Sequence, residues 1–155
     1  MKAFHAERAH LIPDDWRISG EYMYARHSVA YTKANGNPLK SWFYGFGVWD
    51  EYNRLLPWDE TLDVFGMIDV VPVPELYRGP WDEKEISRIA SQIDPQTQEG
   101  FVIRDTGMID YPDGNGDAGR FFRHVAKWVR KGHVQTDEHW SFRWRDEPEY
   151  RNELA

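Results

Sequence analysis

The sequence of 155 residues contains no cysteine. Neither a disulfide framework nor a zinc site with thiolate ligands can therefore form. The sequence also lacks an apolar run long enough to span a bilayer and a start of the signal-peptide type, so we expect a soluble cytoplasmic protein with no membrane partner. We find no internal repeat and no linker, which favours a single domain over residues 1–155.

The sequence has fewer positively charged than negatively charged residues. The chain has 19 Lys and Arg against 26 Asp and Glu, and its net charge at pH 7 is −7. This balance argues against a protein that coats nucleic acid without specificity, although a local basic groove can still bind it. Apolar residues make up 41% of the chain and aromatic residues 15%, which suits a folded core. We expect most of the eight tryptophans to lie in that core.

Hydrophobic periodicity predicts both helices and strands. The expected helices span 2–11, 58–68 and 80–93, and the main expected strands span 16–25, 41–49, 99–104 and 121–130. In the second helix we expect Leu62, Phe65 and Met67 to point inward. This mixture favours an α+β fold with antiparallel sheets and helices packed outside them. The highly charged end of the chain, 143–155, is expected to be frayed or helical.

Two apolar segments carry charged residues where a sheet would bury them. Glu99 precedes the run 100–104, and Lys127 lies at the centre of the run 125–130. A carboxylate and an ammonium group in a packed sheet are costly unless something neutralises them. Two arrangements would do so: an ion pair between neighbouring strands, or a metal-bound nucleotide phosphate held between the two groups.

Glu21 and Phe46 raise similar questions in two other strands. Glu21 follows Gly20 inside an otherwise apolar strand, where it is either an exposed residue of an edge strand or a functional carboxylate. Phe46 lies between Gly45 and Gly47. These glycines either leave space for a flat ligand against the ring or mark a bulge in a core strand.

Several other polar patterns are less specific. The run 33–36 reads Lys-Ala-Asn-Gly and has the form of a nucleophilic-lysine motif, but Asn-Gly followed by Asn-Pro is better explained as a turn. The acidic residues of 105–119 lack the spacing and the final glutamate of a calcium loop. His27 is interpreted as structural, and so are His133 and His139, which do not have the spacing of a helical metal pair.

Taken in chain order, four groups of residues follow the nucleotidyltransferase motifs of a known family. They are Gly20-Glu21, Phe43-Tyr44-Gly45-Phe46, Glu99-Gly100-Phe101-Val102 and Lys127 within 125–129. The sequence resembles the ATP-dependent RNA ligases, which belong to the covalent nucleotidyltransferase superfamily with DNA ligases and mRNA capping enzymes. The resemblance runs from about Ala9 to Trp140. It implies that antiparallel sheets form a nucleotide-binding cleft with flanking helices, in a ligase domain of nucleotidyltransferase or ATP-grasp type.

The resemblance also implies particular roles. Such enzymes form lysyl-AMP from ATP, transfer AMP to an RNA 5′-phosphate and seal the strand with a 3′-hydroxyl. Glu21 would bind the ribose and Phe46 would stack on adenine. Glu99 would bind Mg²⁺ or Mn²⁺ and Lys127 would hold the α-phosphate, which makes these two the expected catalytic residues. Arg104 would contact phosphate or RNA, and the partners would be RNA ends or nicked RNA.

The sequence departs from the family pattern in two places. Two residues after Lys127, where the family often has a second lysine, stands Val129. The nucleophilic lysine should lie well before Glu21, but Lys2 is the only lysine there and no glycine follows it closely. Lys33 comes after Glu21, in the wrong order. We therefore expect a domain that is incomplete at its N-terminus, with the nucleophile supplied by a complementing ligase fragment or a homodimer partner.

Three classes of function are compatible with these patterns. The chain is part of an active RNA ligase, a non-catalytic module that binds nucleotides or RNA ends, or a structural protein on the same scaffold. The third class is disfavoured, because a structural descendant has no reason to keep charged residues inside strands. The sequence leaves open whether the substrate is a nick, a tRNA break or a free end, and whether the joined strand is RNA or DNA.

Overall fold

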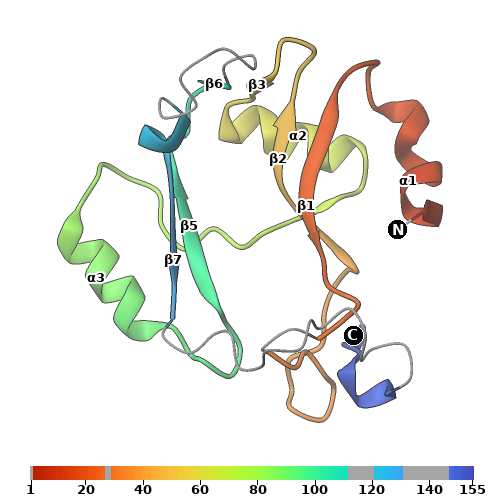
Figure 1. Cartoon of the computed structure of the whole chain (residues 1–155), viewed down its shortest axis with the longest axis vertical. Helices are drawn as coiled ribbons and strands as arrows, with labels where there is room; N and C mark the ends of the chain where they lie inside the picture. Colours follow the sequence, from red (N-terminus) through yellow and green to blue (C-terminus); the bar gives the residue numbers. More distant parts are fainter. Residues whose placement is uncertain (1, 27–28, 112–120, 131–146) are drawn as a thin grey trace. The chain divides into compact units, whose positions relative to one another are not determined.

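The computed structural model describes residues 2–26, 29–111, 121–130 and 147–155 (Figure 1). The chain divides into two compact units. Unit 1 consists of Met1–Tyr22, Phe43–Val73 and Ile103–Ala126, and unit 2 consists of Met23–Trp42, Pro74–Val102 and Lys127–Ala155. Helices and mainly antiparallel sheets make up the described residues, which confirms the predicted α+β fold.

Unit 1 is built on a five-stranded sheet. Its strands run in the order β1 (Arg17–Tyr22), β2 (Phe43–Trp49), β3 (Arg54–Leu55) and β6 (Ile109–Asp110), with β4 (Val71–Pro72) also paired to β2. All pairs are antiparallel except that of β2 with β4. This exception arises because α2 (Trp58–Met67) returns the chain after β3, so that β4 runs in the direction of β2. Strand β1 lies at one end of this strand order.

The core of unit 1 lies on one face of the sheet, which we call the core face. The core comprises Phe43, Val48, Leu56, Phe65, Ile68 and Val70. Helix α1 (Lys2–Arg8) and the 3-10 helix η1 (Ala9–Leu11) together match the helix predicted over 2–11. Phe4 of α1 packs on Phe43 with ring centroids 5.4 Å apart. Met67, expected to point inward, is 71% exposed, because Phe65 and Ile68 occupy the core positions in the last turn of α2.

In unit 2, helix α3 (Glu83–Gln92) begins later than predicted. The sequence suggested Pro80 as its first residue, but Asp82 caps the helix. The Asp82 carboxylate accepts a hydrogen bond of 2.8 Å from the backbone N–H of Lys84. A capping carboxylate stabilises a helix start by satisfying an N–H group that has no partner within the helix, and this outweighs the preference of proline for the first position.

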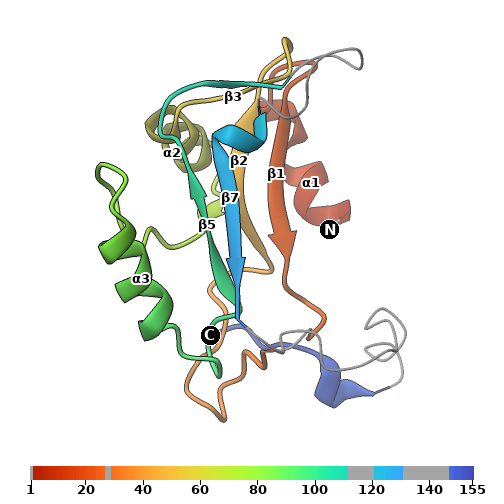
Figure 2. The ribbon, with the colours of Figure 1, turned by 60° about the vertical axis from the view of Figure 1, so that its left-hand side comes forward.

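Strands β5 (Gly100–Arg104) and β7 (Val125–Val129) form a separate two-stranded sheet and run in opposite directions (Figure 2). Two backbone bonds flank the ladder, from Asp105 N to His124 O and from Arg130 N to Glu99 O, each 3.0 Å long. The strand predicted over 121–130 is thus shorter, because its first residues form the 3-10 helix η2 (Phe121–Arg123).

The described end of the chain packs against the segment 23–42 within unit 2. It contains a 3-10 helix, η4 (Pro148–Tyr150), followed by single bridges that pair Arg151 with Ala25 and Leu154 with Leu39. Asn152 is buried, and its Nδ2 donates to Met23 O at 2.7 Å. Residues 147–155 are therefore packed rather than frayed, while 143–146 lie outside the described residues. Across the described part of the chain, no helix has the length and apolar character needed to cross a membrane.

Candidate functional site

Phe46 occupies a bulge in β2. The ladder between β1 and β2 pairs Ser19 with Gly47 and then Gly20 with Gly45, so Phe46 has no partner residue across the ladder. An extra residue of this kind re-aims side chains and is common next to functional sites. The Phe46 side chain is 46% exposed. The bulge that the sequence offered as one explanation of the two glycines is confirmed.

The alternative explanation of these glycines, a space for a ligand beside Phe46, is wrong. A Cβ atom on Gly45 would lie 2.5 Å from Cζ of the Phe65 ring and 2.8 Å from Cγ1 of Val70, so core side chains already fill that position. A Cβ atom on Gly47 would lie 2.8 Å from Cδ1 of Leu55. Both glycines serve close packing, and the Phe46 ring itself is the surface that remains for a ligand.

Glu21 and Phe46 share the face of the sheet opposite the core, which we call the outer face. A Cβ atom on Gly20 would meet the Phe43 ring of the core, so its neighbour Glu21 points to the other side. Glu21 pairs with Tyr44, which also alternates away from Phe43. Glu21 is exposed. The outer face thus presents a carboxylate and an aromatic ring from adjacent strands.

Glu99 and Lys127 belong to the ladder of β5 and β7. Glu99 directly precedes β5 and is half-buried, whereas Lys127 is exposed. Phe101 and Trp128 stack with centroids 5.2 Å apart, so strand alternation places Lys127 on the other face of β7. The flanking backbone bonds set a register in which Val102, not Glu99, lies opposite Lys127. The described residues show no ion pair between Glu99 and Lys127, so the interstrand ion pair is not the arrangement found.

Arg104 is held inside unit 1. Its Nη2 donates to Leu56 O at 2.8 Å and its Nε to Asp105 O at 3.1 Å, and its guanidinium carbon lies 5.6 Å from the Trp58 ring centroid. Burial lowers the pKa of Arg104, and the Asp105 carboxylate partly opposes this. Nη1 is buried without a hydrogen-bond partner among the described residues. Arg104 therefore stabilises the start of α2.

Lys33 lies in a turn, as predicted. Gly36 has a φ of 74° and its N–H donates to Lys33 O at 3.1 Å. The Asn35 side-chain oxygen accepts bonds of 3.2 Å from the N–H groups of Thr32 and Asn37. The turn thus accounts for both residues of the Asn-Gly pair, because glycine readily adopts positive φ and the asparagine side chain accepts the hydrogen bonds of the turn.

Several predicted features lie outside the described residues. They are His27, His133, His139 and the part of the acidic loop over 112–119. Among the residues that the structure does describe, no group of three His, Asp or Glu side chains could hold a metal ion.

The sequence analysis did not single out Asp50, Arg17 or Trp49. Asp50 is buried to 3% exposure and forms an ion pair of 2.7 Å with Arg54. Burial acts to raise the pKa of Asp50, but hydrogen bonds from Arg54 and Tyr52 outweigh it and hold the pKa below the usual value. The spacing Asp-x-x-x-Arg across a turn was the available signal. Arg17 and Trp49 lie on the outer face, where β1 pairs with β2.

The fold and the outer face describe an α+β protein with a carboxylate and an aromatic ring displayed on adjacent strands. The model of the RNA ligase family matches residues 1–129. This match covers most of the chain, and the chain belongs to the RNA ligase family. Neither a curated protein nor a solved structure matches the chain. Family membership supports a ligase-type function that involves RNA.

Proposed function

We propose that the chain is the nucleotide-binding part of an ATP-dependent RNA ligase of the covalent nucleotidyltransferase superfamily, acting in the cytoplasm as one domain. The observation that carries this proposal is the outer face of unit 1. Phe46, lifted out of the ladder by a bulge, and Glu21 on the next strand face the same side. An aromatic ring suits a base, and a carboxylate suits the hydroxyl groups of a ribose.

Each residue has a role that follows from its chemistry. The Phe46 ring stacks on adenine, and Glu21 accepts hydrogen bonds from the ribose. Lys127 is a compact cation that neutralises charge on the α-phosphate during transfer of the adenylyl group. Arg104, whose side chain is partly exposed, contacts phosphate or RNA. When bound, ATP would supply an adenylyl group to the nucleophilic lysine with release of pyrophosphate. That group would pass to an RNA 5′-phosphate, and the 3′-hydroxyl would then close the strand with release of AMP.

Glu99 is the proposed metal ligand. Mg²⁺ commonly uses one or two carboxylates and completes its coordination with phosphate oxygens and water, so a large protein cluster is not required. Mn²⁺ accepts the same hard oxygen ligands. A single half-buried carboxylate therefore fits a cation that arrives with ATP, and Glu99 would hold it.

The nucleophilic lysine is proposed to come from residues outside this sequence, in the same protein or in a complementing chain. Lys33 is already explained by its turn. Strand β1 lies at the end of the strand order in its sheet, and a further strand could pair there by β-augmentation. This position supports complementation, because β1 also carries Glu21.

The proposal is tested by nucleotide binding and by labelling. We expect Phe46→Ala and Lys127→Ala each to weaken ATP binding about tenfold or more, since stacking alone contributes about 1–3 kcal/mol. Lys84→Ala on α3 removes the same charge as Lys127→Ala and should leave ATP binding unchanged. Wild-type affinity in the Phe46 and Lys127 variants would overturn the proposed site.

Incubation with α-labelled ATP and magnesium, followed by denaturation, tests the source of the nucleophile. We expect no label on this chain alone, and label on a ligase fragment that carries the missing lysine when the two are mixed. Label on Lys33 of the isolated chain would show that the turn lysine is the nucleophile and would refute complementation.

A further inference from the structure

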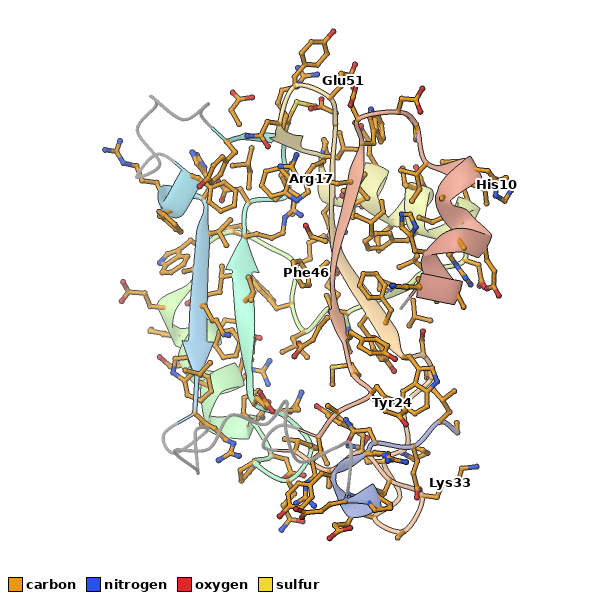
Figure 3. All side chains as sticks on the ribbon, turned by 45° about the vertical axis from the view of Figure 1, so that its right-hand side comes forward. His10, Arg17, Tyr24, Lys33, Phe46 and Glu51 are labelled. Carbon is orange, nitrogen blue, oxygen red and sulfur yellow. The ribbon has the colours of Figure 1, made fainter. Side chains whose placement is uncertain are left out.

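Beside the proposed nucleotide site, the outer face of unit 1 carries an arginine stacked on a tryptophan. Arg17 pairs with Trp49 across β1 and β2, and its guanidinium carbon lies 4.7 Å from the Trp49 ring centroid. In Figure 3 Arg17 and Phe46 both lie on the side of β1 away from α1. Arg17 is four residues before Glu21 on the same strand face, about 13 Å along the strand. The pair thus continues the outer face beyond Phe46.

Trp49 is fixed in place by several contacts. Its Nε1 donates to Ser19 Oγ at 2.9 Å. Its ring stacks on Phe121 with centroids 5.7 Å apart and an interplanar angle of 30°. Tyr111 meets both rings edge-on, with centroid distances of 6.1 Å to Trp49 and 5.2 Å to Phe121. An ordered aromatic cluster loses little conformational entropy when a flat ligand stacks on it.

Arg17 keeps its positive charge available. Its Nη2 donates to Asn53 Oδ1, and Asn53 in turn donates through Nδ2 to Tyr111 O at 3.2 Å. These partners are neutral, and within the described residues no carboxylate forms an ion pair with Arg17. Two other arginines differ from Arg17 in this respect, since Arg54 and Arg88 each form an ion pair with a carboxylate. An oriented cation without an anionic partner is complementary to a phosphate.

We propose that Arg17 and the Trp49–Phe121–Tyr111 cluster bind single-stranded RNA next to the nucleotide site. Proteins recognise unpaired RNA by stacking bases on aromatic rings and on guanidinium planes, while cations neutralise the phosphates. This cluster offers both kinds of contact on one rigid sheet face. The inference rests on the proposed ligase function and adds to it a subsite for the RNA strand, with Arg17 as the residue that contacts it.

The test is fluorescence anisotropy with a labelled single-stranded RNA 12-mer, titrated with the full chain at several salt concentrations. We expect Arg17→Ala to weaken RNA binding about tenfold, in the range found for the loss of one stacking contact. We also expect the slope of log K against log salt to fall by about 0.7, the value for one phosphate contact on a single strand. Arg17→Lys keeps the charge and should restore the slope but not the affinity, because lysine lacks the planar group.

The matched control is Arg88→Ala, which removes the same charge from an exposed position on α3. It should leave RNA binding unchanged. Equal effects of Arg17→Ala and Arg88→Ala would overturn the subsite, and so would undetectable RNA binding by the wild-type chain. Full affinity in Arg17→Lys would refute the stacking contact.

ATP affinity, measured on the same variants, separates this inference from the proposed function. Arg17→Ala should bind ATP like the wild type. Loss of the RNA effect with intact, Phe46-dependent ATP binding would reject the subsite alone. If Phe46→Ala and Lys127→Ala left ATP binding unaltered while Arg17→Ala impaired RNA binding, the proposed nucleotide site would be rejected and the RNA surface retained.

Discussion

At the scale of single residues, the buried carboxylate of Asp50 closes the turn between β2 and β3. Oδ1 accepts bonds of 3.0 and 2.9 Å from the N–H groups of Tyr52 and Arg54, and Oδ2 accepts one of 2.8 Å from Arg54 Nε. Asp50→Ala leaves these donors without an acceptor, so we expect the free energy of unfolding to fall by about 2 kcal/mol in urea denaturation. Asp63→Ala, at an exposed position of α2, is the control and should have little effect. Similar losses in both variants would contradict this role.

The same carboxylate should make stability depend on pH. Because its pKa is lowered in the folded state, Asp50 stabilises the fold above its unfolded pKa of about 3.9, and this contribution is lost as pH falls through the folded value. Urea denaturation between pH 6 and pH 3 should show this acid loss in the wild type and a smaller loss in Asp50→Asn. An unchanged pH dependence in the variant would show that other groups cause it.

At the scale of the elements, the contact between β2 and α2 allows no side chain at Gly45. A methyl group there meets both Phe65 and Val70, so we expect Gly45→Ala to cost about 1–3 kcal/mol through overpacking. Gly66→Ala on α2 is the matched control, because nothing lies within 4 Å of its Cβ position. That substitution should stabilise the helix by about 0.5–1 kcal/mol. Thermal unfolding of the two variants measures both effects, and a stable Gly45→Ala would refute the close packing.

The elements also show what sequence patterns could predict. Strongly periodic or aromatic segments such as α2 and β2 were located well, because burial and propensity agree there. The start of α3 was misplaced because two local start signals, Pro80 and Asp82, compete over three residues. The inward position assigned to Met67 failed for a similar reason, since one helical turn offers the core only some of its apolar residues. The bulge was one of two interpretations, and only the packing at Gly45 could distinguish them.

The candidate site was predicted one residue at a time. Glu21, Phe46, Glu99 and Lys127 came from motif order, and their roles stay predictions. Arg17 was missed because a lone arginine in a strand is a common surface residue, and its importance depends on Trp49 across the ladder. Contacts of this kind join residues distant in sequence and leave no local pattern.

At the scale of the whole molecule, the boundary between the two units crosses strands β5 and β7. Residues up to Val102 of β5 belong to unit 2, and those from Ile103 belong to unit 1. Since paired strands are continuous across this boundary, we expect the chain to unfold as one domain. Tryptophan fluorescence and far-UV circular dichroism should give the same urea midpoint. Two separate transitions would contradict the single domain predicted over 1–155.

The bulge at Phe46 affects how this sheet can change during evolution. On either side of Phe46, Gly45 faces the core, Gly47 faces outward and Val48 faces the core again. Without Phe46 the side chains of β2 would alternate regularly between the two faces of the sheet. Phe46 is therefore equivalent to a single residue, and so a single codon, inserted into a regular strand. Deletion of that codon should yield a chain that folds and keeps its core but has lost the ring that is proposed to stack on a base. In this strand, three nucleotides of coding sequence therefore separate the proposed binding function from the scaffold.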